Sequence, residues 1–250
     1  MTFTKLDIAT ADGVADSYLV KPDGDQPRPG VLLLMDAFGL RPQIETMMRR
    51  LADRGYVVLA PNTLYRGGRS PVVPLDGMDD PLRRDEVIGR IRPLMAELTT
   101  ERLVSDGGAY LDRLQAESDG QPAAITGYCM GGRVGWQIAA AYPHRVAALG
   151  CFHTGGLVSG GDDSIHLSAA KITAELYLGF ADNDQSMTAE QIKTVEQELD
   201  RAGVSYRSEV YENAAHGYTM ADTPAYNRAA AERHFDELFG LLERSLPAGS

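Results

Sequence analysis

The sequence is poor in the residues from which several common kinds of site are built. It has two cysteines among 250 residues, Cys129 and Cys151, which is too few for a disulfide framework. It shows no His and Cys cluster at zinc-site spacing and no GxGxxG motif at a strand-to-helix turn. We therefore expect no metal and no cofactor.

Positive charge and long apolar runs are also scarce. The 24 Lys and Arg against 35 Asp and Glu give a net charge of -11, which argues against nucleic acid and anionic membrane surfaces as partners. No apolar run approaches the ~20 residues that a membrane span needs, and the opening residues contain no apolar signal core. We expect a cytoplasmic protein that acts on a small molecule. Its oligomeric state is not indicated.

Strand patterns alternate with helix patterns along most of the chain. An edge hairpin is expected over 4–20, and a further alternating strand over 204–211. Apolar runs typical of buried parallel strands lie at 31–35, 56–60, 123–126, 146–152 and 174–180. Helical spacing covers 42–54, 81–98 with a kink or break at Pro93, 100–115, 133–141, 186–202 and 224–246. This order predicts one α/β domain over 1–246, a mostly parallel sheet covered by helices on both faces, with a flexible tail at 247–250.

The most informative stretch is GYCMGG at 127–132, between a buried strand and a helix. A thiol at the apex of a glycine-rich turn between strand and helix is the form of a nucleophile elbow. In such a turn the helix N-terminus favours negative charge on the thiol and supplies N–H groups to a developing oxyanion. The alternative is that Cys129 is a small buried apolar residue in an ordinary turn.

Two further residues complete a possible catalytic set. A thiol nucleophile needs a base, and the base needs an acceptor that orients it. Asp184 and His216 each follow a predicted strand, so both are expected at the same sheet edge as Cys129. Asp182 competes with Asp184 for the orienting role. The other histidines are His144, His153, His166 and His234. We prefer His216 as the base, because it lies in the loop after the last predicted strand.

With these residues the chain resembles the dienelactone hydrolase family of α/β-hydrolases. The matching pieces are the elbow at 127–132, DAFGL at 36–40, Pro61 with Leu64 and Tyr65, and AHGY at 215–218. Their order, nucleophile then acid then histidine, is also that of α/β-hydrolases in general. The resemblance implies a single-domain α/β-hydrolase fold that hydrolyses carboxylic esters or lactones without a cofactor.

The resemblance also implies a role for each matching position. Cys129 would be the nucleophile, His216 the base and Asp184 the residue that orients it. The backbone N–H groups of Ala37 and Met130 would form the oxyanion hole. The position of Asp36, where the family has Glu, would contact the resting thiol and move when substrate arrives, which we call thiol gating.

Contacts to the substrate are expected from residues near the predicted sheet edge. The candidates are Phe38, Tyr65, Arg66, Tyr128 and His153. Met220 stands where the archetype of the family has an arginine that holds a substrate carboxylate, so the sequence does not identify the substrate. The irregular segment 62–80 is expected at the rim of the site, and the sequence does not say whether it moves as a lid.

Two other functions fit the same residues. A thioesterase or acyl transferase would use the same three side chains with a different leaving group or acceptor. A non-catalytic binding protein would keep the fold and pocket without turnover. The order of Cys129, Asp184 and His216 favours the hydrolase, because a binding protein has no need of all three.

Overall fold

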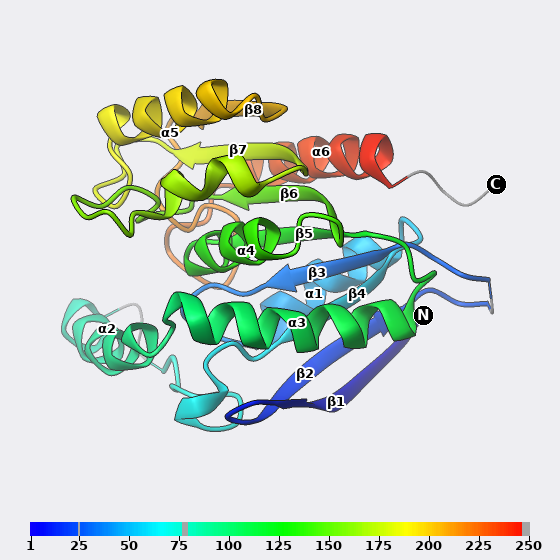
Figure 1. The fold of residues 1–250 in the computed structure, drawn as a ribbon. Coiled ribbons are helices and arrows are strands. Elements are labelled where there is room, and N and C mark those ends of the chain that lie inside the picture. The colour runs from blue at the N-terminus through cyan, green and yellow to red at the C-terminus, as the bar shows by residue number, and fades with distance from the viewer. Residues whose placement is uncertain (25, 77–79, 247–250) are drawn as a thin grey trace.

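The computed structural model describes residues 1–24, 26–76 and 80–246, and it is built on one sheet of eight strands (Figure 1). The order across the sheet is β1-β2-β4-β3-β5-β6-β7-β8. The strands are β1 Thr2–Thr10, β2 Gly13–Lys21, β3 Gly30–Leu34, β4 Val57–Pro61, β5 Ala123–Tyr128, β6 Val146–Phe152, β7 Glu175–Ala181 and β8 Tyr206–Tyr211. This is the predicted mostly parallel sheet.

The sheet has an antiparallel edge and a parallel centre. β1 and β2 form the predicted antiparallel hairpin, and β2 also runs antiparallel to β4. The strands from β4 through β8 pair in parallel; in the centre of the sheet Leu32 of β3 lies between Leu59 of β4 and Ile125 of β5. Every residue of β3, β4 and β5 is buried, as expected for parallel strands that are covered on both faces.

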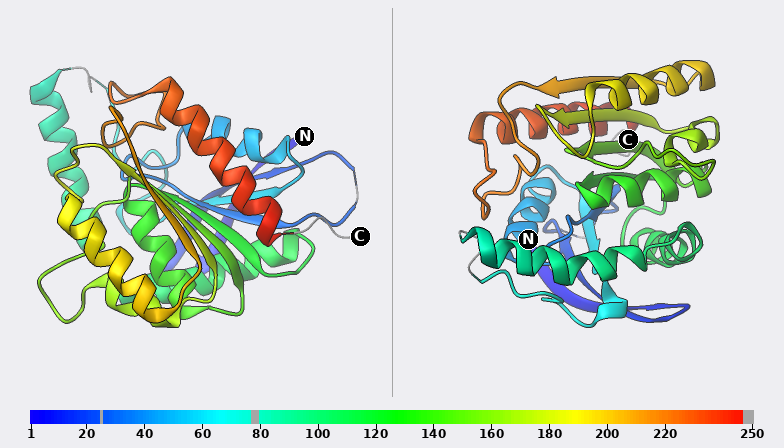
Figure 2. Two further views of the ribbon diagram at one scale, coloured as in Figure 1. Left: turned by 90° about the horizontal axis from the view of Figure 1, so that it is seen from above. Right: turned by 90° about the vertical axis from the view of Figure 1, so that its left-hand side faces the viewer.

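Helices cover both faces of the sheet (Figures 1 and 2). α1 and α6 lie on one face, whereas α3, α4 and α5 lie on the other. α2 lies beyond the carboxyl ends of the parallel strands. The helices are α1 Pro42–Ala52, α2 Pro81–Ala96, α3 Thr100–Glu117, α4 Met130–Ala141, α5 Ala189–Ala202 and α6 Arg228–Ser245, with short 3-10 turns η1 Tyr65–Gly67 and η2 Ile165–Lys171. The two layers bury one continuous apolar core against the sheet.

The structure departs from the predicted elements in a few places. α2 is continuous through Pro93, so the helix does not break there, and the alternative of a kink stays a prediction. α6 begins at Arg228 instead of residue 224, because the Asn227 side chain caps it by accepting the Ala230 N–H. η2 was not predicted. The predicted tail at 247–250 lies outside the described residues, as do residues 77–79 of the segment 62–80.

The two glycines in α3 allow α3 and α4 to pack closely. A Cβ on Gly107 would come within 2.6 Å of Ile138, and one on Gly108 within 2.6 Å of the Tyr142 hydroxyl. Both partners belong to α4 or to its C-terminal cap. A side chain at either position would therefore push the two helices apart.

The elbow between β5 and α4 is packed backbone against backbone. Cys129 has φ 54° and ψ −115°, a conformation that costs energy in a residue with a side chain. A Cβ on Gly131 would overlap the carbonyl oxygen of Leu34 in β3, and one on Gly127 would overlap that of Gly131. The elbow therefore fixes Cys129 at the carboxyl edge of β3 and β5.

Within the described ranges, no helix has both the length and the apolar character that a membrane span requires.

Gly131→Ala should lower the free energy of unfolding by about 3 kcal/mol, because the new methyl group meets backbone that cannot rotate away. Gly89→Ala, on α2 with open space around it, is the control and should stabilise the protein by about 0.5–1 kcal/mol. Urea unfolding followed by circular dichroism measures both. Equal unfolding midpoints for the two variants would contradict this account of the elbow.

Candidate active site

Three loops bring the candidate residues to the carboxyl edge of the sheet. Cys129 follows β5, Asp184 lies in the turn after β7, and His216 lies in the loop after β8. Parallel strands end at the same edge, so residues that are distant in sequence meet there. The structure places these three side chains together.

The three side chains form a continuous chain of polar contacts. His216 Nδ1 lies 2.6 Å from Asp184 Oδ2, and His216 Nε2 lies 3.0 Å from the Cys129 thiol. Asp184 is 4% exposed in its side chain and His216 is 32% exposed. Cys129 is partly buried. The imidazole therefore has one nitrogen on an acid and the other on a thiol that solvent can reach.

Asp184 and His216 shift each other's pKa in the directions that keep both side chains charged. Burial would lower the pKa of His216, but its contacts with Asp184 and Cys129 outweigh burial and raise the pKa to about 10. Burial would raise the pKa of Asp184, yet its hydrogen bonds with His216 and Ser186 hold that pKa below its ordinary value. These two shifts favour an imidazolium held by a carboxylate.

Sequence reasoning missed Ser186, which fixes the Asp184 carboxylate. Its backbone N–H and its hydroxyl both donate to Asp184 Oδ1, at 2.8 and 2.7 Å, and leave Oδ2 to His216. The available signal was a serine two positions after an Asp, which is typical of a local turn. Asp182, the competing acid, accepts the Asn213 N–H at 3.0 Å and ties two loops together.

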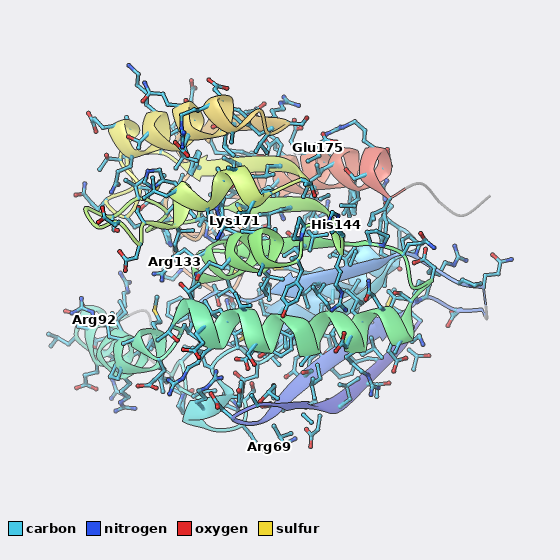
Figure 3. All side chains as sticks on the ribbon, viewed as in Figure 1. Arg69, Arg92, Arg133, His144, Lys171 and Glu175 are labelled. Atoms are coloured by element: carbon cyan, nitrogen blue, oxygen red, sulfur yellow. The ribbon has the colours of Figure 1, made fainter. Side chains whose placement is uncertain are left out.

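The other candidate histidines have different surroundings. His144 lies at the opposite end of α4 from Arg133, away from the carboxyl edge (Figure 3). His166 Nδ1 lies 2.8 Å from the Ser164 hydroxyl. His234 is buried, and burial lowers its pKa to about 3, so it is a neutral residue of the core. Only His153 shares the site with His216.

Two backbone amides face the same edge. Met130 is the first residue of α4, and the first N–H groups of a helix have no acceptor within it. Ala37 lies in the turn after β3, and nothing in the described part of the chain accepts a hydrogen bond from its amide. Both amides are thus available to an oxyanion, and their role in an oxyanion hole stays a prediction.

A cavity of about 240 Å³ opens beside the thiol. It is lined mostly by apolar groups. The lining residues are Asp36, Ala37, Phe38, Arg84, Cys129, His153, His216, Gly217, Met220, Thr223, Pro224 and Ala225. The predicted substrate residues Phe38 and His153 are among them. Arg84 of α2 and the residues 223–225 were missed, because no local pattern shows that α2 and this loop meet.

His153 is buried within this cavity wall. Its φ of 39° is unusual for a residue with a side chain, and its Nε2 lies 2.8 Å from the Thr219 hydroxyl. Its ring stands nearly edge-on to that of His216, with centroids 5.4 Å apart. Burial holds the pKa of His153 well below its ordinary value, so it is neutral beside the charged pair.

The other three predicted substrate residues do not line this cavity. Arg66 pairs with Asp106 at 2.8 Å and with Asp12 at 2.7 Å, and the Tyr65 hydroxyl donates to Asp106 at 3.0 Å. Tyr128 is fully buried in the core. Acidic partners distant in sequence hold Tyr65 and Arg66 at the hairpin end of the molecule, and a role of these three residues in substrate binding stays a prediction.

Asp36 lines the cavity, but its carboxylate is bound by Arg41. Arg41 Nη1 donates to Oδ1 at 2.6 Å and Nη2 donates to Oδ2 at 2.9 Å. The thiol of Cys129 is instead in contact with His216. This differs from the resting contact between Asp36 and the thiol that the resemblance implies, so thiol gating stays a prediction.

Among the described residues, no group of three or more His, Cys, Asp or Glu side chains is arranged to hold a metal ion.

Comparison with known proteins gives a consistent picture. A sequence model of the dienelactone hydrolase family matches residues 15–246. A relative from Escherichia coli K12, named "Putative carboxymethylenebutenolidase", is 29% identical over 226 residues, 86% of this chain and 77% of the relative. The "Carboxymethylenebutenolidase" of Rhodococcus opacus is 27% identical over 223 residues, 88% of this chain and 82% of the relative.

A solved structure from Klebsiella pneumoniae, titled as a "Putative Dienelactone Hydrolase", shares the fold. Its TM-score is 0.84 at 21% identity, and the match covers 97% of this chain and 98% of that one. At this identity the likeness supports the α/β-hydrolase fold alone.

The two cysteines should react very differently with iodoacetamide at neutral pH. Cys129 should be alkylated rapidly, because it is partly exposed and next to His216. Cys151 should stay unmodified in the folded protein, because it is 1% exposed and burial raises its pKa to about 12. Mass spectrometry of the digested protein measures both rates.

His216→Asn should slow the alkylation of Cys129 by about tenfold or more, since the imidazole no longer takes the thiol proton. His144→Asn, at the far end of α4, is the matched control and should leave the rate unchanged. Faster labelling of Cys151 than of Cys129 would contradict the environments described here.

Proposed function

Because the chain belongs to the dienelactone hydrolase family, we propose that it hydrolyses a carboxylic ester or lactone through an acyl-enzyme on Cys129. The observation that carries the proposal is the chain of contacts from Asp184 through His216 to Cys129, which ends in the cavity. The family supplies the class of reaction. The chemistry of the three side chains supplies the mechanism.

In the first half of the proposed reaction, the Cys129 sulfur attacks the substrate carbonyl while its proton resides on His216 Nε2. The carbonyl oxygen becomes an oxyanion, which accepts hydrogen bonds from the Ala37 and Met130 amides. The intermediate collapses, the C–O bond breaks, and His216 gives its proton to the leaving alkoxide. An ester releases an alcohol, whereas a lactone opens and keeps its hydroxyl on the acyl chain.

In the second half, His216 takes a proton from water, and the resulting hydroxide attacks the thioester carbon. A second oxyanion forms in the same place. When it collapses, the C–S bond breaks, the carboxylic acid leaves, and Cys129 regains its pairing with His216. Asp184 keeps the imidazole in one orientation throughout, because its Oδ2 accepts from Nδ1.

The cavity favours a small acyl group with an apolar body. Its volume is about 240 Å³, and Phe38, Met220 and Pro224 contribute apolar surface. The name of the relatives refers to a lactone that carries a carboxymethylene group. Arg84 lines the cavity and is the residue that we propose to face a substrate carboxylate, a task that Met220 lacks the charge to perform.

Brief exposure to p-nitrophenyl acetate should place an acetyl group on Cys129, and intact-protein mass spectrometry should see it appear and clear. Cys129→Ala should give no adduct. His216→Ala should either form none or keep it, because no base activates the water. An absence of adduct and of product from oxygen esters and thioesters alike would favour a non-catalytic binding protein. Faster turnover of thioesters would favour a thioesterase.

Ala37→Pro should lower kcat by about 10²–10³-fold, since it removes one oxyanion donor without removing a side chain that reacts. Ala37→Gly keeps the amide and is the matched control, expected to stay close to the wild-type kcat. The melting temperature of both variants checks that the fold is kept. An Ala37→Pro enzyme that is folded and fully active would rule out this amide as an oxyanion donor.

A further inference from the structure

One guanidinium joins two acids from opposite ends of the sequence, beside the candidate site. Arg41 holds both oxygens of Asp36 at 2.6 and 2.9 Å. On its other side, Nε donates to Asp222 Oδ2 at 2.6 Å and Nη2 donates to Asp222 Oδ1 at 3.2 Å. The side chains of Arg41 and Asp36 are 7% and 5% exposed, so this ion pair lies inside the protein.

Asp36 shapes the turn that presents the Ala37 amide. Its Oδ1 accepts the Phe38 N–H at 3.1 Å, and its backbone carbonyl accepts the Gly39 N–H at 3.2 Å. These two bonds close the loop between β3 and α1 around Ala37. The carboxylate at this position therefore stabilises the turn as a hydrogen-bond acceptor.

The negative charge of the same carboxylate would oppose a thiolate nucleophile. Asp36 lines the cavity together with Cys129 and His216, and a buried negative charge there would oppose the formation of the thiolate. Burial also raises the pKa of Asp36, against the lowering effect of Arg41. An ion that is removed from water needs a close partner of opposite charge, and Arg41 is that partner.

Other ionisable groups face the thiol from the surrounding elements. His216 lies in the loop after β8, is held by Asp184 and carries positive charge. His153 lies at the end of β6 and is neutral. Arg133 of α4 interacts electrostatically with Cys129, and Arg84 of α2 lines the cavity. Asp36 is therefore the acid of the cavity lining, and unlike Asp184 it does not pair with the imidazole of His216.

We propose that Arg41 is a positioning residue of the active site, which neutralises Asp36 and holds its carboxylate away from Cys129 and His216. Asp36 can then shape the oxyanion turn without opposing the nucleophile. This inference rests on the proposed function, in which Cys129 is the nucleophile. It assigns to Arg41 a role that depends on the charge of Asp36.

The contacts of Arg41 with Asp222 connect this turn to the opposite wall of the cavity. Asp222 lies in the loop after His216, between the lining residues Met220 and Thr223. A further contact from α1 to the same loop, Gln43 Nε2 to the Thr219 carbonyl at 3.4 Å, runs alongside it. Arg41 thereby links the loop that carries Phe38 to the loop that carries Met220.

A double-mutant cycle separates this role from simple structural support. The variants are Arg41→Met, Asp36→Asn and the two combined, measured as the full chain. The readouts are the alkylation rate of Cys129 with iodoacetamide, kcat and KM for p-nitrophenyl acetate, and the melting temperature. Alkylation reports on the nucleophile alone, so it does not depend on how substrate fits the cavity.

Arg41→Met should slow alkylation and lower kcat by about tenfold or more, with a smaller change in KM. Asp36→Asn supplies the reference rate for the double variant, because asparagine still offers an acceptor oxygen to the turn but carries no charge. In the double variant the alkylation rate should return to that of Asp36→Asn, since the buried charge that Arg41 neutralises is gone, and Asp222, 37% exposed in its side chain, is still reached by solvent.

The cycle also defines the results that would overturn the inference. If Arg41→Met costs as much in the Asp36→Asn background as alone, Arg41 acts independently of the Asp36 charge and the inference is wrong. If Arg41→Met does not fold, the comparison of the double variant with Asp36→Asn decides the same question. If wild-type Cys129 is not reactive at all, the proposed function fails instead.

Discussion

The contact of backbone with backbone at the elbow is the constraint on which the site depends. Gly131 packs against the Leu34 carbonyl of β3, and Cys129, two residues before it, has a positive φ of 54°. One packing contact therefore sets three things together: where the sulfur stands, where the Met130 amide points, and how near the turn after β3 comes to both. A side chain would overlap backbone at this crossing, which therefore requires glycine.

Charge is distributed around that crossing in two separate pairs. Asp184 serves His216 and makes the imidazole more basic. Asp36 stabilises the turn around Ala37 and is paired with Arg41. If Cys129 acts as a thiolate nucleophile, as we propose, each nearby carboxylate must be paired, because an unpaired negative charge would oppose it. The two pairs achieve this while leaving the cavity surface largely apolar.

Local patterns predicted most of the fold and the three central residues, because strand order and loop position follow from apolar periodicity. Cys129, Asp184 and His216 each follow a strand, and parallel strands bring their ends together. What failed depended on contacts between distant segments. Arg41 meets Asp222 across 181 positions, and Arg66 turns toward Asp106 rather than the cavity. No local pattern encodes which loop an arginine reaches.

The burial of Cys151 has a consequence for the lifetime of the protein under oxidative stress. If peroxide converts Cys129 to a sulfenic acid, the usual protection is condensation with a neighbouring thiol to a disulfide. The second cysteine of the chain is 1% exposed, with its sulfur 3.6 Å from the Gly132 carbonyl beneath the elbow. It is enclosed in the core, where burial raises its pKa to about 12 and keeps it protonated, and a protonated thiol is a poor nucleophile toward a sulfenic acid. Rescue must then come from a thiol outside the chain, before oxidation reaches the irreversible sulfinic stage.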